Sequence, residues 1–142
     1  MAVSQLSIFA ENKPGSLVKM TSLLAEAGVD IRAMSLADTQ DYGILRLIVS
    51  DVKRAREILA ENRFVTSVTP VLAVALPDSP GSLAKAISIL CEAKLSIEYL
   101  YAFVAPKTYA CAVLRVTDNE RAEALLTANG YEMITQDEIS KL

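Results

Sequence analysis

The sequence contains an internal repeat, and this repeat constrains the possible folds more than any other feature. The segment 12–17, Asn-Lys-Pro-Gly-Ser-Leu, returns as the segment 78–83, Asp-Ser-Pro-Gly-Ser-Leu. The two copies stay aligned over most of their length, with one residue gained in a loop of the second copy. We therefore expect two copies of one small unit, at residues 1–69 and 70–142, joined by a very short connection.

Each copy shows the same order of strands and helices. Short apolar runs ended by turn residues indicate first strands at 6–10 and 71–75, and apolar residues at helical spacing indicate a helix after each. The other expected elements are second strands at 30–37 and 96–104, third strands at 44–49 and 110–116, helices that begin after Asp51 and Asp118, and fourth strands at 65–69 and 131–135. The order βαββαβ predicts an α+β fold of two ferredoxin-like units, each an antiparallel sheet with helices on one face.

Apolar periodicity predicts which side of each element is buried. The first helix of each copy has an apolar stripe, made of Leu17, Met20, Thr21 and Leu24 in one copy and of Leu83, Ala86, Ile87 and Leu90 in the other. Alternation along the third strands turns Leu45, Leu47 and Val49 toward the helices, and sends to the outer face Ile44, Arg46, Ile48, Cys111, Val113 and Arg115. Because this outer face is still apolar, we expect the other copy or a second chain to cover it, and we expect a homodimer.

Composition removes several classes of function. The chain has no His and no Trp, so it has no imidazole to act as a general base, to activate a nucleophile or to bind zinc or copper. Cys91 and Cys111 stand apart, without the CxxC spacing of redox and metal sites. No other spacing of acidic and basic residues forms a recognisable catalytic group. We therefore expect no catalytic residue, no metal and no cofactor, and a protein that is not an enzyme.

Charge and hydropathy bear on partners and location. The formal net charge is −3 and no run of basic residues occurs, which argues against nucleic acid and anionic membranes as partners. The same order of elements occurs in RNA-recognition motifs, but the aromatic residues that stack bases there are missing from 44–49 and 110–116. No apolar run is long enough for a signal peptide or a membrane span, so we expect a cytoplasmic protein.

The Pro-Gly loops before the first helix of each copy are the candidate sites. Gly lets other atoms approach the backbone closely, and the N–H groups that follow it at a helix start are unpaired. Such a helix start attracts a carboxylate. The alternative is a plain capped turn, with Asn12 or Asp78 as the N-cap residue.

Together, these motifs resemble the ACT domain, a small regulatory module that usually responds to amino acids. The resemblance rests on the βαββαβ order, on the Asn/Asp-x-Pro-Gly-Ser-Leu segment that opens the first helix, and on the Gly-Val-Asp-Ile segment, 28–31, that follows it. Two copies cover nearly the whole chain, and the remaining segment, 136–142, is too short for a catalytic domain. The chain thus resembles a stand-alone tandem ACT protein.

The resemblance implies an amino acid as the ligand, held where two ACT units lie side by side. It implies that backbone groups at Pro14, Gly15, Ser16 and Leu17 hold the α-carboxylate and that Asn12 holds an ammonium or amide group, with Asp78, Pro80, Gly81, Ser82 and Leu83 as their counterparts. The opposite walls would come from the second strands, at Ile31, Met34, Ile97 and Tyr99. Because Asn12 is neutral and Asp78 is acidic, the two sites need not be equal.

Two functions remain open for a chain of this kind. The first is a non-catalytic binding protein in which an amino acid shifts the preference for a partner or an oligomer. The alternative is a regulatory subunit of a separate enzyme of amino-acid biosynthesis, such as acetohydroxyacid synthase. Such subunits usually join one ACT unit to a different C-terminal domain, which the two similar halves of this chain do not match.

Overall fold

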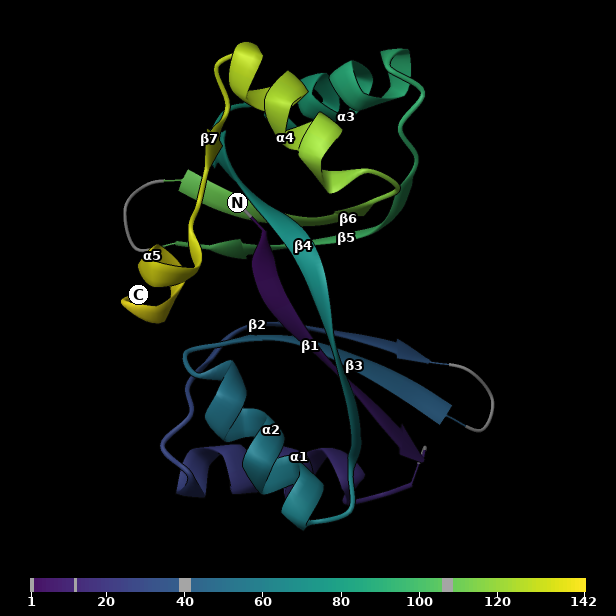
Figure 1. Ribbon diagram of the computed structural model, residues 1–142, viewed down its shortest axis with the longest axis vertical. Coiled ribbons are helices and arrows are strands. Elements are labelled where there is room, and N and C mark those ends of the chain that lie inside the picture. Colours follow the sequence, from purple (N-terminus) through teal and green to yellow (C-terminus); the bar gives the residue numbers. More distant parts are fainter. Residues whose placement is uncertain (1, 12, 39–41, 106–108) are drawn as a thin grey trace. The chain divides into compact units, whose positions relative to one another are not determined.

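The computed structural model describes residues 2–11, 13–38, 42–105 and 109–142, which form two compact units (Figure 1). The larger part of each unit is a continuous segment, Ser4–Thr69 in the first and Pro70–Ser140 in the second. The predicted α+β class, with two βαββαβ units built on antiparallel sheets, is confirmed. No helix in the described ranges is long and apolar enough to cross a membrane.

The first unit places two helices on one face of its sheet (Figure 1). Its elements are β1 (Val3–Glu11), α1 (Ser16–Glu26), β2 (Ile31–Asp38), β3 (Tyr42–Val49), α2 (Val52–Glu61) and the first part of β4 (Val65–Pro77). The strand order is β2-β3-β1-β4. Strand β3 is antiparallel to both of its neighbours, with Leu47 opposite Leu6 of β1 and opposite Met34 of β2.

The second unit repeats this arrangement (Figure 1). Its elements are the second part of β4, α3 (Ser82–Glu92), β5 (Ile97–Val104), β6 (Tyr109–Val116), α4 (Asn119–Ala128), β7 (Glu132–Met133) and α5 (Gln136–Ser140). The strand order is β5-β6-β4-β7, again antiparallel throughout, with Val74 of β4 opposite Ala112 of β6 and Met133 of β7.

Strand β4 differs from the prediction, because the expected strands at 65–69 and 71–75 are one continuous strand. Pro70 does not interrupt it, since the φ of proline is compatible with extended backbone and only a donor is lost. The carbonyl of Pro70 accepts hydrogen bonds from Arg115 Nη1 and Asn119 Nδ2, both at 3.0 Å. The expected short connection between the two copies is therefore the middle of a strand.

The C-terminal segment also differs from the prediction, because β7 has only two residues and a short helix, α5, follows it. A capping box starts this helix: Thr135 N–H donates to Glu138 Oε2 at 2.7 Å and Glu138 N–H donates to Thr135 Oγ1 at 3.3 Å. This reciprocal pair satisfies two backbone donors and ends the extended segment.

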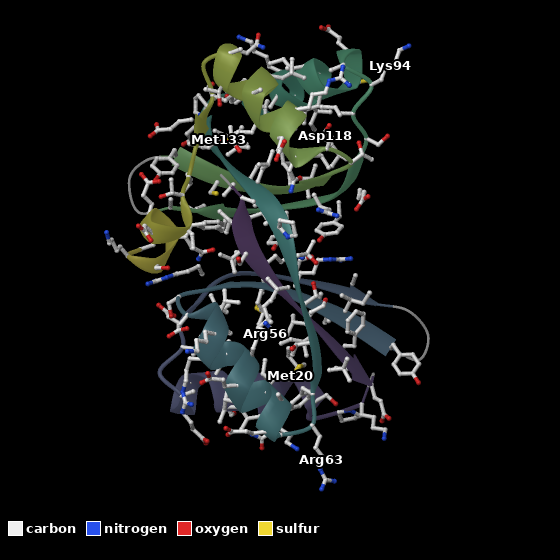
Figure 2. All side chains as sticks on the ribbon, viewed as in Figure 1. Met20, Arg56, Arg63, Lys94, Asp118 and Met133 are labelled. Atoms are coloured by element: carbon white, nitrogen blue, oxygen red, sulfur yellow. The ribbon has the colours of Figure 1, made fainter. Side chains whose placement is uncertain are left out.

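Each unit has its own apolar core between sheet and helices. The first core is formed by Leu6, Ile8, Met20, Leu24, Val29, Leu45, Leu47, Val49, Ala55 and Leu59. The second contains Leu72, Val74, Leu76, Ala86, Leu90, Leu95, Ala112, Leu114, Val116, Ala122, Leu126 and Tyr131. Figure 2 shows Met20 between the helices and the sheet of the first unit. Of the predicted helical stripes, Met20, Leu24, Leu83, Ala86 and Leu90 pack in the cores. Leu17 is 39% exposed, and Thr21 and Ile87 are half-buried outside the two cores.

The predicted alternation along the third strands is confirmed. Leu45, Leu47 and Val49 belong to the first core, and Ile48 points to the other face of the sheet and is also fully buried. In the second unit Cys111 and Val113 are buried outside the core in the same way. What covers these outer faces stays a prediction.

All four long helices end in the same way, with one residue in the left-handed region. This residue is Gly28 after α1, Arg63 after α2, Lys94 after α3 and Gly130 after α4, with φ between +59° and +84°. The next N–H group reaches back to the last turn in a Schellman motif, for example from Leu95 to the carbonyl of Leu90 at 3.0 Å. Glycine adopts this conformation without strain, whereas Arg63 and Lys94 do not.

We predict that Lys94→Gly stabilises the protein. Lys94 points outward from the end of α3 (Figure 2), so the substitution removes backbone strain and no buried contact. The free energy of unfolding in urea should rise by about 1 kcal/mol.

The matched control is Arg56→Gly, at an exposed position inside α2. There glycine should lower the free energy of unfolding by about 1 kcal/mol, because it is a poor helix former. A loss of stability in Lys94→Gly of the same size as in this control would contradict the proposed strain.

Candidate functional site

The helices α1 and α3 start without a side-chain cap. Their N-cap residues are Gly15 and Gly81, with φ of +88° and +91°, and no side chain accepts a hydrogen bond from their first turn. The second helix of each unit is different, because Asp51 accepts from Arg54 N–H at 2.9 Å and Asp118 accepts from Arg121 N–H at 3.1 Å. The uncapped helix start is thus a property of the Pro-Gly loops in both copies.

The alternative interpretation of the second loop, with Asp78 as the N-cap, is wrong. The cap is Gly81, three residues later, and a left-handed glycine has no side chain that could accept a hydrogen bond. Asn12, which would hold the same role in the first copy, lies outside the residues that the structure describes.

The loop before α3 is held by its own serines. Ser82 Oγ donates to the carbonyl of Ser79 at 3.0 Å and lies 2.9 Å from Ser79 Oγ. Both hydroxyl groups therefore support the turn and do not cap the helix. Pro80 and Gly81 are exposed, so the backbone at this helix start faces open space.

A hollow of about 610 Å³, which we name the second hollow, lies beside this loop in the second unit. It is bounded by the end of β4, the loop, the first turn of α3, the start of β6 and the segment that joins α4 to β7. Its lining residues are Ala75, Leu76, Pro77, Ser79, Pro80, Gly81, Ser82, Lys85, Tyr109, Asn129, Gly130, Tyr131 and Glu132.

Tyr131 connects two walls of the second hollow. Its ring belongs to the core of the second unit, and its hydroxyl donates to the carbonyl of Ser82 at 3.1 Å. This hydrogen bond ties the start of α3 to the segment that leads into β7, which are far apart in the sequence. The shape of the second hollow thus depends on a buried side chain.

The first unit has a corresponding hollow of about 510 Å³, which we name the first hollow. It is lined by Phe9, Ala10, Glu11, Ser16, Lys19, Tyr42, Asn62, Arg63, Phe64 and Val65, and each of these residues is the repeat counterpart of a residue that lines the second hollow. Lys19 and Lys85, Tyr42 and Tyr109, and Asn62 and Asn129 are identical pairs.

Comparison with known proteins identifies the family. The chain matches the family model described as "ACT domain pair" over residues 1–142. The chain belongs to the ACT domain family. The predicted resemblance to a tandem ACT protein is therefore confirmed.

Solved structures agree with this assignment. Protein BT0572 from Bacteroides thetaiotaomicron is 35% identical, with a TM-score of 0.93, and the match covers 100% of this chain and 98% of that one. The ligand-free regulatory subunit of aspartate kinase from Thermus thermophilus is 18% identical with a TM-score of 0.63, and the one from Thermus flavus is 20% identical with a TM-score of 0.58; each match covers 88% of both chains. The likeness to the two kinase subunits shows the fold alone. No curated protein sequence matches this chain.

Of the residues predicted to bind a ligand in this ACT pair, four line the hollows. Pro80, Gly81 and Ser82 line the second hollow, and Ser16 lines the first. Five others lie in the loops or in the first helical turns without lining either hollow: Pro14, Gly15, Leu17, Asp78 and Leu83.

The predicted opposite walls lie elsewhere in each unit. Ile31 and Met34 are on β2, Ile97 and Tyr99 are on β5, and none of them lines either hollow. Met34 is exposed, whereas Ile31 and Ile97 pack against the cores. Their role as ligand contacts stays a prediction.

Sequence reasoning missed the charged and aromatic residues of the second hollow. These are Lys85, Tyr109, Tyr131 and Glu132. The identity of Lys85 with Lys19 and of Tyr109 with Tyr42 in the repeat was the available signal. Nothing in the sequence indicated that Tyr131 and Glu132 would meet a helix start so distant along the chain.

The described residues of the ACT pair offer little for covalent or metal chemistry. Burial raises the pKa of the Cys111 thiol to about 12, so its thiolate is scarce near neutral pH. Within the described ranges, no three Cys, Asp or Glu side chains are arranged to hold a metal ion.

Proposed function

We propose that this ACT domain pair is a non-catalytic regulatory protein that binds an amino acid at its Pro-Gly loops. The observation that carries the proposal is the contrast within each unit between a helix capped by Asp51 or Asp118 and a helix that starts uncapped after Gly15 or Gly81. The first N–H group of each helix, at Ser16 or Ser82, already donates to the carbonyl of Lys13 or Ser79. A carboxylate can take the place of the missing side-chain cap by accepting from the N–H groups that follow in the first turn. The helix dipole adds only about 0.3–1 kcal/mol at an exposed end, so the N–H donors matter more.

The proposed contacts differ between the two loops. Backbone groups at 80–83 or at 14–17 hold the α-carboxylate, and Asp78 or Asn12 lies close enough in sequence to contact the rest of the ligand. A second strand from a neighbouring ACT unit, through Met34 or Tyr99, would complete the site. An aromatic wall at Tyr99 favours a ligand with an extended apolar side chain.

The alternative is a regulatory subunit of a separate enzyme of amino-acid metabolism. It is supported by the fold, which this chain shares over 88% of its length with the regulatory subunit of aspartate kinase from Thermus thermophilus. Acetohydroxyacid synthase is a second candidate for the enzyme that this chain would regulate. Isolation of the native protein with a stoichiometric enzyme of this kind would favour the alternative.

We also propose a cytoplasmic location. The support is chemical, because Cys91 and Cys111 are both free thiols and thiols persist in a reducing compartment.

We propose, and predict for the purified protein, a homodimer. Apolar side chains are exposed on the edge strands: Met34 is 46% and Leu36 is 57% exposed on β2, and Val104 is 85% exposed on β5. Met34 and Leu36 lie two residues apart on the same face of β2, and contiguous exposed apolar surface usually marks a packing surface. Size-exclusion chromatography with light scattering should give the mass of two chains, and a monomer at high protein concentration would contradict the proposal.

A thermal-shift screen against the standard L-amino acids tests the proposed function. An amino acid at about a hundred times its dissociation constant adds roughly 2.7 kcal/mol to the free energy of unfolding, which raises the melting temperature of a domain of this size by several degrees. We expect a selective shift with one amino acid or a few related ones. If none of them shifts the melting temperature, the proposal that the free protein binds an amino acid is wrong.

Gly81→Ala tests the loop itself. A Cβ at Gly81 meets no atom within 4 Å, so the substitution strains only the left-handed backbone and displaces the N–H groups of the helix start. We expect the affinity for the amino acid found in the screen to fall about tenfold or more.

Gly28→Ala is the matched control. Gly28 also has a positive φ and open space around it, so the cost in stability should be similar, but it lies at the far end of α1 from the loop. If Gly81→Ala and Gly28→Ala bind the amino acid with equal affinity, the Pro-Gly loop is not part of the binding site.

A further inference from the structure

We infer that the second hollow is the amino-acid site of this chain, that it binds the zwitterion between Lys85 and Glu132, and that the first hollow does not bind it. The inference rests on the proposed function and adds the cavity, the two charged contacts and the stoichiometry of one amino acid per chain.

Two oppositely charged side chains, Lys85 and Glu132, line the second hollow. Lys85 lies in the first turn of α3 and Glu132 lies at the start of β7, and both line the same hollow. Within the part of the chain that the structure describes, neither side chain forms an ion pair, with the other or with a third residue. One cavity thus presents a cation and an anion, each without a counter-charge. An amino acid carries the complementary pair of charges in one small molecule.

The helix termini beside the second hollow carry partial charges of the same sign as the side chains next to them. The uncapped start of α3, at Gly81 and Ser82, lies on the side of Lys85. The end of α4, at Asn129 and Gly130, lies next to Glu132 in the chain. Helix starts carry a partial positive charge and helix ends a partial negative charge, so the backbone favours a carboxylate near Lys85 and an ammonium near Glu132.

The size and the remaining lining of the second hollow suit a small polar molecule with an apolar part. Its volume of about 610 Å³ is within the range of small-molecule sites, roughly 300–1,000 Å³. Leu76 and Tyr109 give it apolar surface, and Tyr131 holds its wall in place through Ser82.

The first hollow lacks the features that would recognise a zwitterion. Val65 stands where the second hollow has Glu132, so the acceptor for the ammonium is missing. The carboxylate that remains, Glu11, forms an ion pair with Lys13. Lys19 Nζ lies 5.6 Å from the centre of the Phe64 ring, a cation–π contact that engages the lysine. The two copies have therefore kept one architecture and diverged in charge.

The test is isothermal titration of the full chain with the amino acid that gives the largest shift in the thermal screen, and with the 2-hydroxy acid of the same side chain. The hydroxy acid keeps the carboxylate and replaces the ammonium by a neutral group. We expect one amino acid bound per chain. Glu132→Gln should weaken amino-acid binding about tenfold and leave hydroxy-acid binding unchanged, because only the ammonium contacts Glu132. Lys85→Gln should weaken both about tenfold.

Lys19→Gln is the matched control, since Lys19 is the counterpart of Lys85 in the first hollow. It should leave both affinities and the stoichiometry unchanged. Lys85 and Glu132 are exposed, so their variants should keep the melting temperature of the unliganded protein.

The outcomes separate the inference from the proposed function. If an amino acid binds at two equivalents per chain, or if Glu132→Gln and Lys85→Gln bind it as the original chain does, the inference is wrong and the proposed function stands. If no amino acid binds, both are wrong.

Discussion

The burial of one apolar face of each sheet beneath two helices is the interaction on which the rest of this structure depends. In the second unit Leu90 of α3 and Leu126 of α4 are fully buried against β4 and β6, so both helices are fixed relative to the strands. The start of α3 and the end of α4 then lie at the same edge of the unit. The second hollow forms there, and Tyr131 belongs both to the core and to the wall of the hollow.

The repeat separates what the fold requires from what has diverged. Both units keep the left-handed glycine before the first helix, the aspartate cap of the second helix and a hollow beside the start of the first helix. The helix ends vary, since Gly28 and Gly130 have the charged counterparts Lys94 and Arg63. The hollows also vary, in the exchange of Glu132 for Val65. The variable positions are exposed, where substitution has little effect on the core and can change binding.

The sequence predicts the order of the elements and the buried side of most of them, because repeat and periodicity are local signals. Alternation along the third strand turns Leu45, Leu47 and Val49 toward the helices, and all three belong to the first core. Two elements differ from this prediction. Tertiary context lets β4 run through Pro70. The short helix α5 starts at the capping box of Thr135 and Glu138, a local signal that apolar periodicity does not include. The hollow could not be predicted, because its walls come from segments as distant as 75–85 and 129–132.

The most direct test of the central claim, that an amino acid binds in the second hollow, is a backbone amide NMR titration of the full chain with the amino acid selected by the thermal screen. We expect shifts that saturate together at Gly81, Ser82, Lys85, Gly130 and Glu132, with little change at their counterparts in the first unit. Shifts of equal size in both units, or shifts confined to residues outside the second hollow, would contradict it.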